Sequence, residues 1–271
     1  MIVATGGCCA CGCFGIGLCP YILRTLIELE MPEPDQLTVS HIMAELEALG
    51  HEQYKCIWQN HGAPEPLFGV KTQDLKPIVK RVKKNHQLAL GLYATGNSDA
   101  QYLAGLIADE RQMTPELLQT WVDGAKWYMH SQFSVACVAS ESPYGREMAL
   151  KWMESPVEQV AVAGWATYSS LVSLRPDVEL DLDEIKNLLI IVESEIGHAQ
   201  NRVRYAMNGF VIAVGVFVSP LKNLALEVGL AIGKVKVDVG NTACKVPYPP
   251  DYINKAEANG IIGKKRKSAR C

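Results

Sequence analysis

The sequence predicts an all-α protein built as an α-solenoid, in which antiparallel helix pairs stack side by side. Only 7% of its 271 residues are aromatic and Ala, Leu and Val are abundant, which favours helix. Apolar residues recur at helical spacing from Thr38 onward, in stretches of about 10–18 residues. The linkers between these stretches are short, which favours sequential pairs that cover one another's apolar faces. A single bundle and an irregular helical globule are the alternatives, since no strict internal repeat is visible.

The first helices are defined by apolar stripes and polar starts. A helix is expected over Thr38–Leu49, where residues such as Ile42 and Leu46 share a face that ends at Gly50. The next is expected to be capped by Thr72 and to run through Val82.

Later helices are defined mainly by their caps. Ser98 and Gln101 form a capping-box pattern ahead of a further apolar stripe. Four more starts pair Ser or Thr with a following Pro, at Thr114-Pro115, Ser142-Pro143, Ser155-Pro156 and Ser219-Pro220. The last expected helices are Asp181–Ile196 and Asn201–Val218, and the short run Val235–Val239 is the one candidate strand.

Composition argues against a chain that is disordered throughout and against one that is strongly basic throughout. With 48% hydrophobic and 20% charged residues, the chain has enough apolar side chain for a sizeable core and is not disordered throughout. The formal net charge is −3, from 26 basic and 29 acidic residues, so the chain as a whole is not strongly basic. Local basic clusters remain compatible with this total.

The first 36 residues differ from the rest and are treated as a leader. Five of the nine cysteines and five glycines lie before residue 20, in a stretch without charge. Met1–Ala10 lacks the Lys or Arg of a signal peptide, and the glycine content argues against a membrane span. The C-C-x-C-x-C cluster from Cys8 to Cys13 could bind a soft metal. We instead expect residues 1–36 to be unstructured or not native, and we assign no metal and no cofactor.

The four remaining cysteines are scattered, which is typical of a reducing compartment. We therefore expect a cytoplasmic monomer that does not interact with a membrane.

Two basic clusters are candidate nucleic-acid contacts. The first has six cations against one acid, Asp74, and consists of Lys71, Lys76, Lys80, Arg81, Lys83 and Lys84. Lys76, Lys80 and either Lys83 or Lys84 share one helical face, where they could contact successive phosphates. A solvated helix face is the alternative interpretation.

The second basic cluster is the segment 263–271, which carries Lys264, Lys265, Arg266 and Lys267. Because it follows Gly260 and Gly263, we expect it to be flexible. A localisation signal and a solubilising end are the alternatives to phosphate contact. The acidic stretch Asp177–Asp183 is expected to face away from DNA.

Several stretches resemble one known family. They are Asn60–Lys71 (NHGAPEPLFGVK), Leu92–Ala100, Lys126-Trp127-Tyr128 and Ala163-Gly164-Trp165. In this order, over residues 42–218, they resemble the DNA alkylation repair family of HEAT-like proteins. The resemblance implies a HEAT-like helical domain, here residues 37–262, whose helical repeats form a curved solenoid with a basic concave face that grips DNA. It also implies that Trp127 and Tyr128 lie near bound DNA.

Active members of that family excise positively charged alkylated purines, and the resemblance locates their catalytic residues. Their Asp falls on Ser131 or Gln132, and no Asp or Glu occurs from residue 124 to 140. Their Arg falls on Val162, and their second Trp near Gly209. A hydroxyl or an amide cannot supply the fixed negative charge that an oxocarbenium-like centre needs.

The sequence therefore predicts a protein that binds duplex or branched DNA, without a catalytic residue for orthodox purine excision. Tyr205 and Phe210 could partly replace the missing aromatic residue. His130 is expected to be a packing or surface histidine. A protein-interaction scaffold and a glycosylase with a rearranged active site are the two alternative functions.

Overall fold

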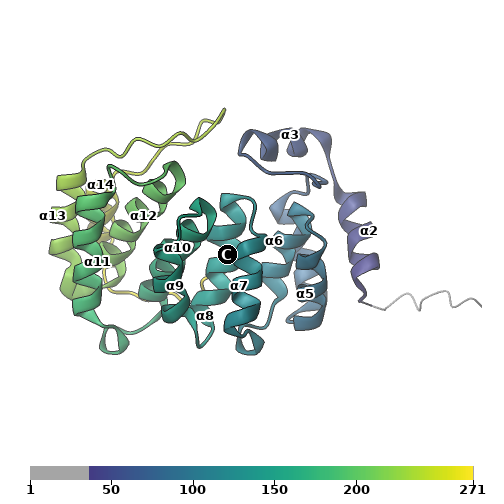
Figure 1. Ribbon diagram of the computed structural model, residues 1–271, viewed down its shortest axis with the longest axis horizontal. Coiled ribbons are helices and arrows are strands. Elements are labelled where there is room, and N and C mark those ends of the chain that lie inside the picture. Colours follow the sequence, from purple (N-terminus) through teal and green to yellow (C-terminus); the bar gives the residue numbers. More distant parts are fainter. Residues whose placement is uncertain (1–36, 271) are drawn as a thin grey trace, which may run out of the picture. The chain divides into compact units, whose positions relative to one another are not determined.

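The computed structural model describes residues 37–270, and these residues belong to one compact unit that begins at Leu37. The predicted leader, with its cysteine cluster, lies outside the described residues. Helices are the regular structure of the described part, which confirms the all-α prediction (Figure 1). The α-helices are α2 (Val39–Leu49), α3 (Glu52–Asn60), α4 (Leu75–Val82), α5 (His86–Ala94), α6 (Ser98–Ile107), α7 (Pro115–Gly124), α8 (Ala136–Glu141), α9 (Gly145–Met153), α10 (Glu158–Leu174), α11 (Leu182–Glu195), α12 (Asn201–Phe217), α13 (Lys222–Ile232) and α14 (Pro249–Ala258). Short 3₁₀ segments are η1 (Thr72–Asp74), η2 (Glu110–Gln112), η4 (Asp177–Glu179) and η5 (Ser219–Leu221), and η3 (His130–Val135) is a π-helix.

Consecutive helices pack as pairs, and the pairs stack in chain order. One row contains α6, η3 with α8, α10, α12 and α14, each in contact with the next. The other row contains α5, α7, α9, α11 and α13, and each of these packs on its partner in the first row (Figure 1). We call the first row the inner row. This arrangement confirms the predicted solenoid of helix pairs.

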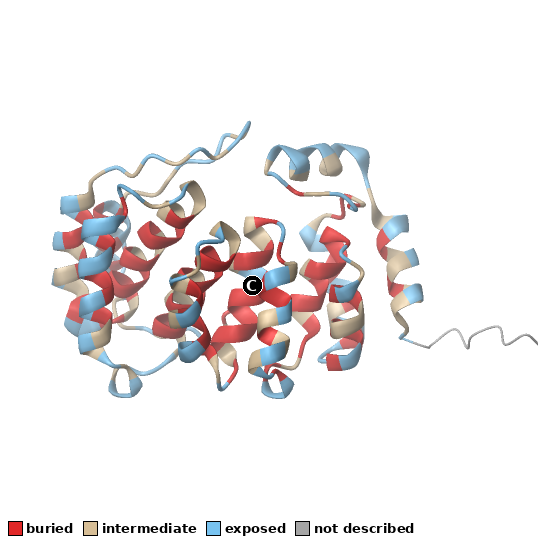
Figure 2. Ribbon diagram, viewed as in Figure 1, coloured by how far each residue is buried: buried red, intermediate tan, exposed pale blue. Residues whose placement is uncertain are grey.

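The buried side chains gather where the two rows meet. One core cluster extends from Ile42 to Ala163 and a second from Ala149 to Ile253, so the apolar interior continues from pair to pair. In Figure 2 the buried residues concentrate on the inner row, whereas α3 has no buried residue. Gly164 allows close packing of α10 on α9, because a Cβ there would lie 2.5 Å from the backbone nitrogen of Met153.

Several helix starts agree with the sequence. Thr38 caps α2 by accepting a hydrogen bond from the His41 amide at 3.3 Å. Thr114 caps α7 with Pro115 in the first turn, and Asp181 caps α11.

Other starts are displaced by one to three residues. Asn97, not Ser98, caps α6, because the Ser98 hydroxyl donates to the Pro64 carbonyl at 2.9 Å. Thr72 begins a 3₁₀ turn instead of capping an α-helix. Ser142 ends α8, and its hydroxyl accepts from the Tyr144 amide just before α9. Polar side chains in these short linkers hydrogen-bond to the nearest free backbone group, which shifts the first helical residue.

The other displaced starts and the unexpected helices lie where sequence patterns are weak. Ser155 accepts from the Val157 amide, and α10 begins one residue later. Ser219 begins η5, and α13 follows. The helices α3, α5 and α14 were not predicted, and residues 235–239 are not a strand. The segment 233–248 instead extends to the end of α3, where a Cβ on Gly240 would lie 2.8 Å from the Asn60 carbonyl oxygen.

The C-terminal segment differs from the expected flexible tail. Residues 263–270, here called the C-terminal strap, cross the carboxyl ends of four inner-row elements in reverse chain order. The Gly263 amide donates to Val216 of α12 and the Arg266 amide to Ser173 of α10, both at 2.8 Å. The Ala269 amide donates to Glu141 of α8 at 2.7 Å, and the Arg270 guanidinium donates to the Ala108 carbonyl beyond α6 at 2.9 Å. The last carbonyls of a helix lack hydrogen-bond partners within the helix. The strap binds to such carbonyls on successive helices, and these carbonyls lie along one line only after the repeats have folded and stacked.

No single helix among the described residues is long and apolar enough to cross a membrane. The bent pair α12 and Ser219–Ile232, with 114° between its two parts, passes such a test by length and composition only.

Candidate nucleic-acid interface

The predicted lysine row lies on α4, which is anchored by its apolar face. Leu75, Ile78 and Val82 are buried in the core, and α4 packs against α6. The backbone that leads into α4 is held by Asp99 of α6, whose carboxylate accepts from the Phe68, Gly69 and Val70 amides at 2.7–3.1 Å. The orientation of the opposite, basic face is therefore fixed by the core.

Three lysines of this cluster are exposed and form no ion pair with any described residue. They are Lys76, Lys80 and Lys83, and we call them the α4 lysine face. Lys76 and Lys80 are one helical turn apart, and Lys83 follows the end of α4. The sequence left open whether Lys83 or Lys84 completes this face. The structure favours Lys83, because Lys84 is engaged with a carboxylate.

The other three cations of the cluster have partners on neighbouring elements. Arg81 bonds to Glu45 of α2, and Lys84 donates to Glu110 at 2.6 Å. The Lys71 ammonium lies 4.7 Å from the centroid of the Tyr54 ring. The sequence shows only Asp74 nearby, because these partners come from helices distant along the chain.

The aromatic pair expected near DNA lies within a small cluster of its own. Trp127 is buried, its indole donates to the His61 carbonyl at 2.7 Å, and its ring contacts Trp58. It therefore does not present a free ring face to a base. Tyr128 is half-buried, and the Arg202 guanidinium of α12 covers its ring at 4.0 Å from the centroid. Arg202 is a cation at this site that the sequence analysis did not find.

The position of the family's catalytic Asp falls in the π-helix η3, a geometry that is common at functional sites. Ser131 is fully buried, and its hydroxyl lies 3.5 Å from the Gln159 side-chain oxygen. His130 is also buried, as expected for a packing histidine, with Nε2 3.0 Å from the Ser98 carbonyl. Burial lowers the pKa of His130 to about 4, so its ring is neutral at pH 7 and donates this hydrogen bond. No carboxylate belongs to this segment.

The other two positions that the resemblance assigns to catalytic residues lie on α10 and α12. Val162 is completely buried in α10. Phe210 is also completely buried, in edge contact with Trp165 and Tyr168, so it does not replace the missing Trp. Tyr205 is only partly buried and remains the one candidate for such a replacement. No group of three or more potential metal ligands comes together among residues 37–270.

The C-terminal basic cluster divides into one half-buried lysine with partners and three exposed cations. Lys265 donates to the Val172 and Phe217 carbonyls at 2.8 and 2.6 Å and pairs with Asp177, so it closes the ends of α10 and α12. Lys264, Arg266 and Lys267 are exposed, and their side chains form no ion pair in the described part of the chain. The strap therefore presents three of its four predicted cations to solvent.

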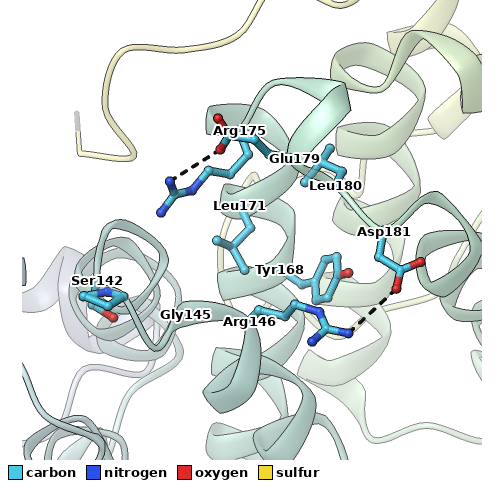
Figure 3. A pocket seen from close by; sticks show the side chains of 10 residues that line it. Ser142, Gly145, Arg146, Tyr168, Leu171, Arg175, Glu179, Leu180 and Asp181 are labelled. Atoms are coloured by element: carbon cyan, nitrogen blue, oxygen red, sulfur yellow. Dashed lines mark ion pairs between the residues drawn. The ribbon is translucent and has the colours of Figure 1, made fainter.

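The acidic stretch 177–183 is occupied by basic partners. Arg175 pairs with Glu179 at 3.7 Å, and Arg146 pairs with Asp181 at 4.0 Å, on two sides of a small pocket (Figure 3). Asp177 pairs with Lys265 of the strap. Arg175 is a further exposed cation that the sequence analysis did not single out.

Helix pairs stacked in this way define a helical-repeat protein of the HEAT-like type. The family model described as DNA alkylation repair enzyme matches residues 42–226. The chain therefore belongs to the DNA alkylation repair enzyme family, which confirms the resemblance seen in the sequence.

Similar proteins agree with this membership. An uncharacterized protein of Listeria innocua and one of Listeria monocytogenes are each 36% identical over 225 residues, which is 81% of this chain and 97% of theirs. A solved structure is 40% identical, has a TM-score of 0.79, and covers 86% of this chain and 100% of its own. It is described as a new family of proteins related to the HEAT-like repeat DNA glycosylases, with affinity for branched DNA structures.

Proposed function

We propose that this protein binds DNA, including branched DNA, through phosphate contacts made by the α4 lysine face. The observation that carries the proposal is the exposed, uncompensated row Lys76, Lys80 and Lys83 in a member of this family. Ammonium groups on a rigid helix can bind successive phosphates and release counterions, which gives a salt-sensitive affinity. The solved relative with affinity for branched DNA supports this choice of ligand.

The same proposal includes the absence of orthodox alkyl-purine excision. That chemistry needs a carboxylate close to a sugar that develops positive charge. The segment at that position offers the buried Ser131 and the amide of Gln132, and the matching cation position is the buried Val162.

Three further parts of the proposal concern the organisation of the protein. It acts as a monomer in the cytoplasm. Residues 37–262 form its HEAT-like domain, and the basic segment 263–271 belongs with the DNA contacts.

The test is a binding titration of a triple variant, Lys76→Gln, Lys80→Gln and Lys83→Gln. We expect weaker binding to duplexes of unrelated sequence by similar factors, because phosphates carry no sequence information. The slope of log affinity against log salt concentration should become shallower by about 3, near 0.9 for each lost phosphate contact. The matched control changes Lys151 of α9, Lys234 after α13 and Lys255 of α14 to Gln, because these lysines are also exposed and form no ion pair with a described residue. If the α4 variant binds as tightly as this control, the α4 lysine face is not the contact surface.

A further inference from the structure

A second group of cations lines a cavity of about 490 Å³ between the C-terminal strap and the ends of α8 and α10. Five cationic side chains line it: Lys84, Arg175, Arg266, Lys267 and Arg270. Two carboxylates, Glu110 and Glu141, also line it. These cations come from three distant parts of the chain, and the docked strap brings them together.

The two carboxylates are already neutralised within the wall of the cavity. Arg270 pairs with Glu110 at 2.8 Å and with Glu141 at 3.5 Å, and Lys84 also donates to Glu110. Burial by itself would raise the pKa of Glu110, but the Lys84 hydrogen bond and the Arg270 charge hold it below its usual value. Glu110 is therefore ionised at neutral pH, and Lys84 and Arg270 compensate its negative charge.

The remaining three cations are available to a ligand. The side chains of Arg266 and Lys267 are exposed and form no ion pair with residues 37–270. Arg175 has only the exposed pair with Glu179 at 3.7 Å, where both side chains are about half exposed (Figure 3). An exposed pair of this kind contributes little and can be exchanged for a phosphate.

We propose that this cavity binds a second segment of nucleic-acid backbone through Arg175, Arg266 and Lys267, apart from the segment on the α4 lysine face. This inference rests on the proposed function and extends it. Lys84 directly follows Lys83 of the α4 lysine face and also lines the cavity, where it shares Glu110 with Arg270, so compensated ion pairs connect the two cation groups. Two groups of exposed cations that are connected by compensated ion pairs fit a ligand that offers two separate backbone segments. Branched DNA is such a ligand, whereas a linear duplex needs only one of the groups.

The test compares the double variant Arg266→Gln, Lys267→Gln with the parent on a four-way junction and on a linear duplex of equal arm length. Neither side chain has a partner in the described structure, and the Arg266 backbone bond to Ser173 is retained, so the melting temperature should not change. We expect junction affinity to fall roughly tenfold and duplex affinity less than about twofold. The salt slope for the junction should become shallower by about 2. Arg175→Gln is a second, independent variant from outside the strap, and Lys151→Gln, Lys255→Gln is the charge-matched control.

The outcomes separate this inference from the proposed function. Equal losses on junction and duplex would mean that the cavity belongs to one continuous duplex path, and an unchanged junction affinity would mean that it binds no DNA. Either result overturns the inference. A parent protein that binds neither ligand would overturn the proposed function as well. If the cavity variants lose junction binding while the α4 variant binds DNA as tightly as the parent, DNA binding by the cavity is supported and DNA binding by the α4 lysine face is contradicted.

Discussion

Two basic side chains with little solvent exposure have different surroundings. His130 is completely buried, its Nδ1 has no hydrogen-bond partner, and its Nε2 donates to the Ser98 carbonyl, so the ring remains neutral. Arg270 is only 11% exposed, and its guanidinium is compensated by two carboxylates and two backbone carbonyls. Burial disfavours charge in both cases, and only Arg270 has partners that compensate it.

The pH dependence of stability should report the state of His130. Its pKa is about 4 in the folded protein, against about 6.5 in the unfolded chain, so unfolding takes up a proton between these values. The free energy of unfolding should therefore fall as the pH drops from 6.5 to 4, with about 2–3 kcal/mol due to His130. Urea denaturation at pH 7 and pH 4 should show this loss reduced in His130→Gln and unchanged in His198→Gln, which alters an exposed histidine. An equal loss in both variants would contradict a neutral, buried His130.

The C-terminal strap is an element without regular structure that completes other elements. Its amides and cationic side chains satisfy carbonyls at the ends of α6, α10 and α12, which water would otherwise have to satisfy. Positive charge at a helix carboxyl end is also favourable for the helix dipole. The strap thus links three repeats, and it positions Arg266 and Lys267 near Arg175 at the same cavity.

Truncation of one anchor should separate the structural cations of the strap from the exposed ones. In Arg270→Ala, Glu110 and Glu141 lose a partner in a largely buried place, and we expect the free energy of unfolding to fall by about 2–4 kcal/mol. Lys267→Ala, three residues earlier, removes an exposed side chain and should change it by less than about 0.5 kcal/mol. Urea denaturation of both variants at pH 7 provides the measurement. Similar small effects in the two variants would show that the strap does not stabilise the repeats.

For the whole molecule, the chain keeps the family fold but differs at the positions that the resemblance assigns to catalysis. The chain shares the fold and most of the length of its relatives. The three positions at which active family members hold Asp, Arg and a second Trp are here a buried hydroxyl or an amide, a buried valine, and a region near Gly209 without Trp. A scaffold of stacked pairs tolerates such changes, because its stability depends on contacts between neighbouring pairs and not on the site.

Incubation with methylated DNA tests this divergence directly. We expect no release of methylated adenine above the spontaneous rate, because no carboxylate of the 124–140 segment can stabilise the cationic sugar. Gln132→Asp is a probe for the missing charge, with Gln132→Asn as its uncharged control. Release by the parent well above the spontaneous rate would show that another set of residues carries the reaction.

Local sequence patterns were sufficient to predict the helical class, the pairing of helices, the family and the basic character of α4. These properties depend on local periodicity, on caps such as Thr38 and Thr114, and on short motifs in order, all of which act within a few residues. The same locality explains the displaced starts at Asn97 and Val157. At each of these starts a polar side chain could hydrogen-bond to several nearby backbone groups, and the packing of the helices determined which hydrogen bond formed.

Which of the cations form ion pairs could not be predicted from local patterns, because it depends on contacts between distant segments. Arg81 and Lys84 are paired with acids 36 and 26 residues away, while Lys83 is not. Lys265 and Arg270 bind helix ends more than 40 residues distant, which converted an expected flexible tail into a docked strap. The residue type gives the charge of a side chain. Whether an opposite charge compensates it depends on the distance between the two groups, and only folding brings groups from distant segments close together.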